Sequence, residues 1–201
     1  MSASALVTFN PIARTDLAQD ARQAFDLPLE RWKVWDARQT GLAIYSSASA
    51  DDLGIYTGTH GTHAPHLSTG DCKNLTMTGR KAGITFRLPH NYVQAGAVSI
   101  NVQAGMVTQA AATLATIEFT AYKLSGQLVD TVYGTSGQLV LTSATDINDL
   151  TWDDYEFALD ARGLAPGDVL DIVANIKITD NQNITAVMGG FRGSIWATCR
   201  G

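Results

Sequence analysis

After residue 41, apolar and polar residues alternate with a period of two through much of the chain. The alternation is clearest in four stretches, which are 82–88, 98–102, 117–122 and 169–178. Because the side chains of a β-strand point alternately to opposite faces, this period predicts half-buried strands rather than helices. One face of the longest strand would carry Leu170, Ile172, Ala174, Ile176 and Ile178.

Turn-forming residues separate these stretches, and the predicted strands do not alternate with predicted helices along the chain. Residues 41–201 hold about eight or nine strand candidates, a number typical of an antiparallel sandwich. The long connections between them favour a jelly roll over an immunoglobulin-like arrangement. We therefore predict an all-β protein, an antiparallel β-sandwich of jelly-roll type over residues 41–201. The pair Gly189 and Gly190 would permit a bulge or kink in its last strand.

The beginning of the chain follows a different pattern. The stretch "TDLAQDARQAF" starts with Thr15, a residue that caps helices, and ends with Phe25. Its apolar residues, among them Leu17 and Ala21, fall on one helical face. We expect a short helix here, docked on another part of the protein because a helix of this length is marginal alone.

The stretch "LERWKVWD", residues 29–36, would place apolar and charged side chains on both faces of a strand. Two tryptophans flanked by basic residues suit an edge or an interface, so we assign Trp32, Val34 and Trp35 to contacts with other subunits. The alternative, a strand within the protein's own core, stays open. We divide the chain into residues 1–40, an N-terminal helix and extended arm for inter-subunit contacts, and residues 41–201, the sandwich.

Charged residues make up only 16% of the chain, compared with about a quarter in an average soluble protein. A neutral surface is easily desolvated, which favours a protein packed against other subunits, and we expect a homotrimer. The net charge is −5 and no basic stretch occurs, so nucleic-acid binding is not expected. No apolar run of about 18 residues or secretion signal is present, which predicts a protein that is made in a cytoplasm and does not bind membranes.

Three of the four histidines, His60, His63 and His66, lie three residues apart in "THGTHAPH". Zinc takes three or four ligands in a tetrahedron, and neither a helix nor a strand would bring all three imidazoles together. We interpret the stretch as an exposed loop and expect no bound metal and no cofactor. One alternative is that a histidine from each chain of a trimer meets on the threefold axis.

No nucleophile elbow, phosphate-binding loop or zinc-protease helix occurs, so we do not expect an enzyme. A cluster of acidic residues is the main candidate for chemistry, because paired carboxylates can hydrolyse glycosidic bonds. A solvated loop and strand face is the simpler interpretation. The cluster consists of Asp146, Asp149, Asp153, Asp154, Glu156 and Asp160.

Four segments together resemble a group of structural proteins of tailed bacteriophages and prophages. They read "RWKVWDA", "DDLGIYTGTHGTHAPHLSTGD", "FRLPHNYVQAGAVSINVQAGM" and "GLAPGDVLDIVANI". The plan of the chain is similar to that of jelly-roll capsid decoration (cement) proteins. The resemblance implies a virion structural protein without catalytic residues, assembled in the host cytoplasm. It would bind the major capsid protein on the outside of the head as a trimer and stabilise the shell.

A second hypothesis is a receptor- or carbohydrate-binding module of a head or tail fibre. The loops of β-sandwiches often recognise glycans through aromatic side chains. The candidates in this chain are Tyr45, Tyr56, Tyr92 and Trp152.

Overall fold

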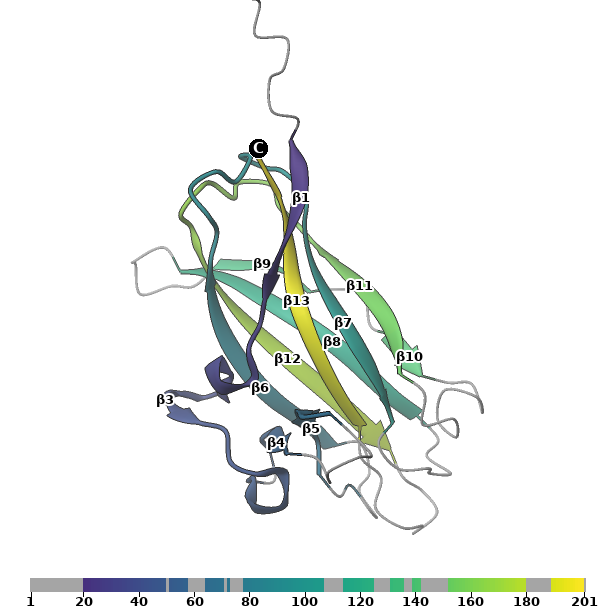
Figure 1. Ribbon diagram of the computed structural model, residues 1–201. Coiled ribbons are helices and arrows are strands. Elements are labelled where there is room, and N and C mark those ends of the chain that lie inside the picture. The colour runs from purple at the N-terminus through teal and green to yellow at the C-terminus, as the bar shows by residue number, and fades with distance from the viewer. Residues whose placement is uncertain are drawn as a thin grey trace, which may run out of the picture.

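Two antiparallel β-sheets pack face to face in the computed structural model of the protein (Figure 1). The predicted fold class, an all-β jelly-roll sandwich, is confirmed. The structure describes residues 20–49, 51–57, 64–70, 72, 78–106, 114–124, 131–135, 139–141, 152–179 and 189–200.

The first sheet, sheet A, has the strand order β11-β7-β13-β5-β4, and β1 pairs with β13 over Ser194–Cys199, beyond the residues that pair with β5. Its strands are β1 (Ala21–Asp26), β4 (Gly54–Tyr56), β5 (His66–Ser68), β7 (Val98–Met106), β11 (Asp153–Leu159) and β13 (Gly189–Cys199). Sheet B has the order β10-β8-β12-β6-β2-β3, with β9 also paired to β8. Its strands are β2 (Lys33–Val34), β3 (Ala37–Gly41), β6 (Thr78–Arg87), β8 (Leu114–Leu124), β9 (Thr131–Thr135), β10 (Leu139–Leu141) and β12 (Val169–Thr179). Two short 3₁₀ helices are η1 (Leu29–Arg31) and η2 (Tyr45–Ser47).

The long strands alternate between the two sheets along the chain. The strands β6, β8 and β12 belong to sheet B, and β7, β11 and β13 belong to sheet A. Each connection in the series β6-β7-β8 and in the series β11-β12-β13 therefore crosses from one sheet to the other, as in a jelly roll.

The alternation with a period of two correctly predicts which side chains of the long strands are buried in the core. On β12 the five alternate residues from Leu170 to Ile178 are all at most 1% exposed. Val98, Ile100 and Val102 of β7 face them from sheet A and are equally buried. Gly189 and Gly190, which would permit a bulge or kink, form no bulge against β7, because β13 pairs with β7 in continuous register from Gly189 to Ala197.

The predicted N-terminal helix is wrong for residues 21–25, which belong to β1. All six residues of β1 pair with β13, in a register that runs from Ala21 opposite Cys199 to Asp26 opposite Ser194. The Phe25 ring also packs 5.7 Å from that of Phe86 in sheet B. An isolated short helix would make none of these contacts, so the tertiary pairing outweighs the local helical pattern. Residues 15–19 lie outside the described part of the chain.

Trp32 lies in the core and not on a surface that a neighbouring subunit could contact. It is 1% exposed, and its ring meets that of Phe191 edge to face at 5.4 Å. Val34 is half-buried in β2, and half-buried Trp35 lies under the Lys81 ammonium at 4.3 Å. The interface assignment is therefore wrong for Trp32. The boundary expected near residue 40 is also wrong for residues 21–40, because β1, β2 and β3 are strands of the two sheets.

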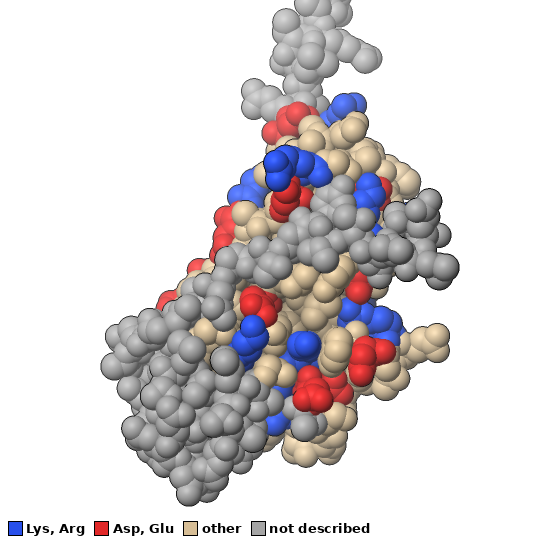
Figure 2. Space-filling model, turned by 180° about the vertical axis from the view of Figure 1, so that it is seen from behind, with Lys and Arg blue, Asp and Glu red and all other residues tan. Residues whose placement is uncertain are grey.

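Basic and acidic side chains intermingle on the surface that Figure 2 shows from behind. Sheet B and its turns supply three ion pairs, which are Arg38–Asp171 at 2.7 Å, Lys123–Asp168 at 2.6 Å and Lys177–Glu118 at 2.8 Å. Burial by itself would raise the pKa of Glu118, but hydrogen bonds from Lys177 and Asn175 lower that pKa below its ordinary value. The charges on this side thus largely neutralise one another.

Candidate ligand-binding groove

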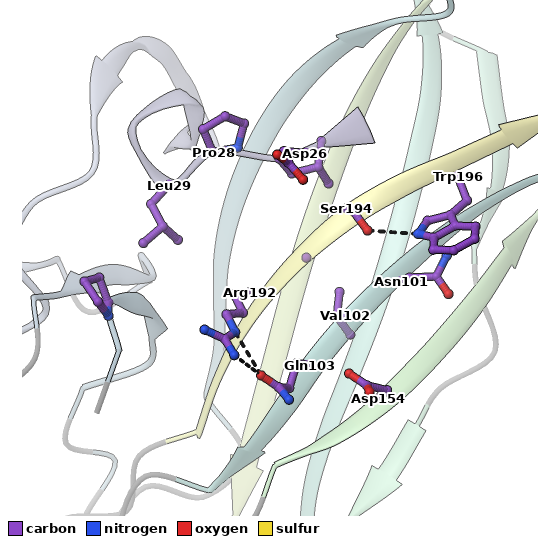
Figure 3. A pocket seen from close by; sticks show the side chains of 13 residues that line it. Asp26, Pro28, Leu29, Asn101, Val102, Gln103, Asp154, Arg192, Ser194 and Trp196 are labelled. Carbon is purple, nitrogen blue, oxygen red and sulfur yellow. Dashed lines mark hydrogen bonds between the residues drawn. The ribbon is translucent and has the colours of Figure 1, made fainter. Parts of the chain in front are cut away.

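A groove of about 800 Å³ lies on the outer face of sheet A (Figure 3). Strands β13, β7 and β11 form its floor, and the connection from Asp26 to Leu29 forms one wall together with Pro65. The polar side chains of the floor are Asn101, Gln103, Asp154, Arg192 and Ser194, and Trp196 lines the groove on the same strand as Arg192.

The strand period explains why these side chains share one face. On β13, Phe191 and Ile195 point into the core, so Arg192, Ser194 and Trp196 point outward. The pairing then aligns them across the sheet, because Gln103 on β7 stands opposite both Arg192 on β13 and Asp154 on β11. Neighbouring strands lie only about 4.8 Å apart, so these three side chains form a row across the groove.

Hydrogen bonds fix several of the groove side chains. The Arg192 guanidinium donates to Gln103 Oε1 through Nε at 2.9 Å and also through Nη2. Trp196 Nε1 donates to Ser194 Oγ at 3.0 Å. The Arg22 guanidinium lies 5.3 Å from the centre of the Trp196 ring and donates to Glu156. The Trp196 ring is therefore held in place at its end of the groove (Figure 3).

The groove combines hydrogen-bonding groups of several kinds with a small net charge. It contains two carboxylates, Asp26 and Asp154, and one guanidinium, that of Arg192. Each of the ion pairs found among the described residues involves other side chains. Carboxylate, amide, hydroxyl and guanidinium groups thus line one depression beside an indole ring, an arrangement suited to a neutral ligand rich in hydroxyl groups.

Four aromatic side chains form a cluster on the same outer face, which we call the aromatic shelf: Tyr45, Tyr56, His66 and Trp152. The ring of Tyr56 lies 5.2 Å from that of Tyr45 and stacks on His66 at 4.8 Å. The Trp152 ring packs edge to face on the His66 ring, with the two ring centres 4.7 Å apart. His66 is 1% exposed, whereas the other three are half-buried.

A glycine makes room for the shelf. A Cβ atom at Gly190 would lie 2.6 Å from His66 Cδ2, so the imidazole rests directly on the backbone of β13. The His66 Nδ1 atom lies 2.8 Å from the Ala64 carbonyl oxygen, which fixes the ring further. His66 therefore lies in a buried strand, and the prediction that it lies in an exposed loop is wrong.

The remaining histidine candidates, His60 and His63, lie outside the described residues. Within the described residues, no group of three or more His, Cys, Asp or Glu side chains is arranged to hold a metal ion. His66 packs against the rings of Tyr56 and Trp152, and its Nδ1 atom lies close to the Ala64 carbonyl oxygen.

The structure brings together three of the four aromatic residues named from the sequence for glycan recognition, namely Tyr45, Tyr56 and Trp152. Tyr92 is separate from them. It is 1% exposed, it forms a bridge to Cys199, and its hydroxyl donates to the Gly96 carbonyl at 2.5 Å. Tyr92 is therefore a core residue and not a ligand contact.

Tyr92 should make the protein sensitive to alkali. Burial, together with the nearby Asp168 and Cys199, raises the pKa of Tyr92 from 10.0 to about 12. Because burial disfavours the ionised phenolate, the stability of the fold should fall by up to about 3 kcal/mol as the pH rises from 10 through about 12. Tyr92→Phe should cost about 1 kcal/mol at pH 7 by removing one hydrogen bond. Urea melts at pH 7 and 12 should therefore show the order of stability of the two proteins reversing, and an unchanged order would contradict this account.

The side chains of the acidic cluster interact with different partners. Glu156 pairs with Arg22 at 2.5 Å, and this hydrogen bond lowers its pKa. Arg162 likewise lowers the pKa of Asp160 to about 2. A general acid for glycoside hydrolysis needs a raised pKa, so neither carboxyl suits that role. Asp154 lies in the groove, and Asp146 and Asp149 are outside the described residues.

The groove residues were not predicted from the sequence. A usable signal was present, because Asn101 and Gln103 occupy the polar face of one predicted strand, and Arg192, Ser194 and Trp196 share a face of another. What the sequence did not show is that these two strands are neighbours.

No family model matches the chain, and no curated protein matches it. Among solved structures, it is similar to the CBM22-1 xylan-binding domain of Xyn10C from Paenibacillus barcinonensis, with 14% identity over 75% of this chain and 83% of that domain and a TM-score of 0.41. It is also similar to CBM27-1 from Caldicellulosiruptor saccharolyticus, solved in complex with mannohexaose, with 9% identity over 88% of this chain and 97% of that module and a TM-score of 0.40. A third similar structure is the mosquito-larvicidal Cry4Aa toxin of Bacillus thuringiensis, with 14% identity over 74% of this chain and 21% of the toxin and a TM-score of 0.43.

All three identities are below 25%, and all three TM-scores are below 0.5. Several neighbours are carbohydrate-binding modules, and the sugars named for them are their own ligands. The described residues contain no helix that is long and apolar enough to cross a membrane.

Proposed function

We propose that the protein is a non-catalytic carbohydrate-binding β-sandwich that holds its ligand in the groove on sheet A. The observation that carries the proposal is the groove itself, in which a fixed indole ring and a row of hydrogen-bonding side chains line one depression. A sugar presents hydroxyl groups around its rim and C–H groups on its faces. Both kinds of surface find partners here, because an aromatic ring packs on apolar faces while amide and carboxylate groups bind hydroxyls.

The charge of the groove favours neutral sugars. Two carboxylates oppose one guanidinium, and Arg192 already donates to Gln103. A chain of uronic acids would place carboxylates near Asp26 and Asp154, and like charges in a partly desolvated groove repel each other. Neutral polysaccharides should therefore be retained more strongly than anionic ones.

Groove substitutions test the function directly. Native-gel affinity electrophoresis of the full chain against a panel of neutral and anionic polysaccharides should show retardation by at least one neutral member. Gln103→Ala and Asp154→Ala should each weaken that binding about tenfold, because each removes hydrogen bonds from a row at the centre of the floor.

The matched controls are Gln39→Ala and Asp36→Ala, which change exposed residues of the β2–β3 hairpin in sheet B. Both should bind like the original protein. The proposal fails if no polysaccharide is retained, or if the groove variants bind as well as the controls.

The resemblance to phage decoration proteins remains a separate prediction, together with the major capsid protein as partner and the homotrimer. Neither the fold nor the comparisons bear on it. Of the two hypotheses drawn from the sequence, the groove supports the carbohydrate-binding module, and its location on a head or tail fibre is again a prediction. Co-sedimentation with purified phage heads is the measurement that would favour decoration.

A further inference from the structure

We propose that the aromatic shelf is the second end of the binding site, so that the groove takes several consecutive sugars of a linear polysaccharide lying along β13. This inference rests on the proposed function and adds the length and direction of the ligand. Two half-buried rings of the shelf, Tyr56 and Trp152, would contact the sugar chain beyond the polar row.

Strand register places the shelf next to the groove. Gly190 on β13 stands opposite Gly105 on β7, and Trp152 precedes Asp153, which pairs with Ala104. Trp152 therefore belongs to the row that comes immediately before the row of Arg192, Gln103 and Asp154, and the His66 ring lies over Gly190 of that earlier row. Pro65 lines the groove and is followed directly in the chain by His66, so the wall of the groove runs into the shelf.

The distance between the two aromatic ends sets the length of the ligand. Trp196 lies six positions after Gly190, which is under the shelf, on β13. At about 3.3 Å per residue of an extended strand, the ends are about 20 Å apart. A single sugar cannot reach both, whereas a chain of several sugars can contact both ends and the polar row between them.

The residues of the shelf have different tasks in this arrangement. His66 is buried between Tyr56 and Trp152, which leaves it little surface for a ligand. It acts as a positioning residue that holds the two rings over the backbone of Gly190. Tyr56 and Trp152 keep part of their surface exposed, and aromatic surface next to hydrogen-bonding groups is what a sugar face requires.

Calorimetry with oligosaccharides of two and six sugars, prepared from the polysaccharide that the protein retains, tests the inference. The original protein should bind the six-sugar chain at least about tenfold more tightly than the two-sugar chain, as expected for one additional aromatic contact. Trp152→Ala should bring the ratio of the six-sugar to the two-sugar affinity close to one, and Trp152→Phe should restore part of that ratio. An unchanged urea midpoint shows that each variant is folded.

The matched control is Trp35→Ala, which removes a half-buried tryptophan beside Lys81 on the sheet B side and should keep the length dependence. Equal binding of both chain lengths by the original protein would overturn the inference and leave the proposed function standing. The inference is also overturned if Trp152→Ala behaves like the original protein, or if it loses affinity for both lengths equally. If no polysaccharide is retained, the proposed function and this inference fail together.

Discussion

Replacing Trp32 by alanine should lower the free energy of unfolding by about 3–5 kcal/mol, the range for removing a large aromatic side chain from a core. Trp32 is 1% exposed and packs edge to face on Phe191, whose ring in turn meets Phe119 of the opposite sheet at 5.5 Å. These rings connect the segment after η1 to both layers of the sandwich. Because a domain of this kind is stable by about 5–15 kcal/mol in total, the loss is a large share of its stability.

Urea denaturation followed by tryptophan fluorescence and circular dichroism measures this loss. Trp35→Ala is the control, because its half-buried ring contacts the Lys81 ammonium near the surface, and its removal should cost about 1 kcal/mol. If Trp32→Ala unfolded at the same urea concentration as the original protein, Trp32 would not be a core residue, and the interface assignment made from the sequence would be revived.

The sandwich could be predicted from the sequence because its long strands each carry a local signal. In β12, every second residue is apolar, and burial of that face needs no knowledge of its partners. The same holds for β7 and for the alternation of Ile117 and Phe119 in β8. Strand existence and the inward face are thus properties of a short window of residues.

The strand β1 could not be predicted in this way. Residues 21–26 are mostly exposed, and only Phe25 has a clear partner across the sandwich. Their stability as a strand comes from pairing with Ser194–Cys199, more than 160 residues later in the chain. A local pattern that suits a short helix therefore competes with a long-range pairing that no window of residues reveals, and the pairing prevails.

The groove, and the clustering of the aromatic candidates in the shelf, could not be predicted for a related reason. The outward-facing residues of each strand could be identified from the sequence. The row of Arg192, Gln103 and Asp154, however, exists only because β7 lies between β13 and β11. The shelf likewise needs β5 beside β13, and it needs Gly190 to leave space for the His66 ring. The sequence indicated which side chains were suited to a glycan, and register decided which of them meet.

Deletion of residues 1–30 should destabilise the sandwich strongly, because residues 21–26 form a strand of sheet A. The deletion removes the whole of β1, the contact of Phe25 with Phe86, and Leu27, which is 5% exposed. Loss of these two apolar side chains alone should cost about 3 kcal/mol or more. It also removes the wall of the groove formed by Asp26 to Leu29, so carbohydrate binding should weaken as well.

The matched control is deletion of residues 1–19, which leaves every described strand in place. Its urea midpoint and its retention by polysaccharide should equal those of the full chain, whereas the longer deletion should melt much earlier and bind weakly. Equal midpoints for the two deletions would mean that β1 adds little to the fold and that residues 1–30 form an arm. Because the two truncations differ only by residues 20–30, a difference in stability between them measures what β1 and its connection contribute to the sandwich.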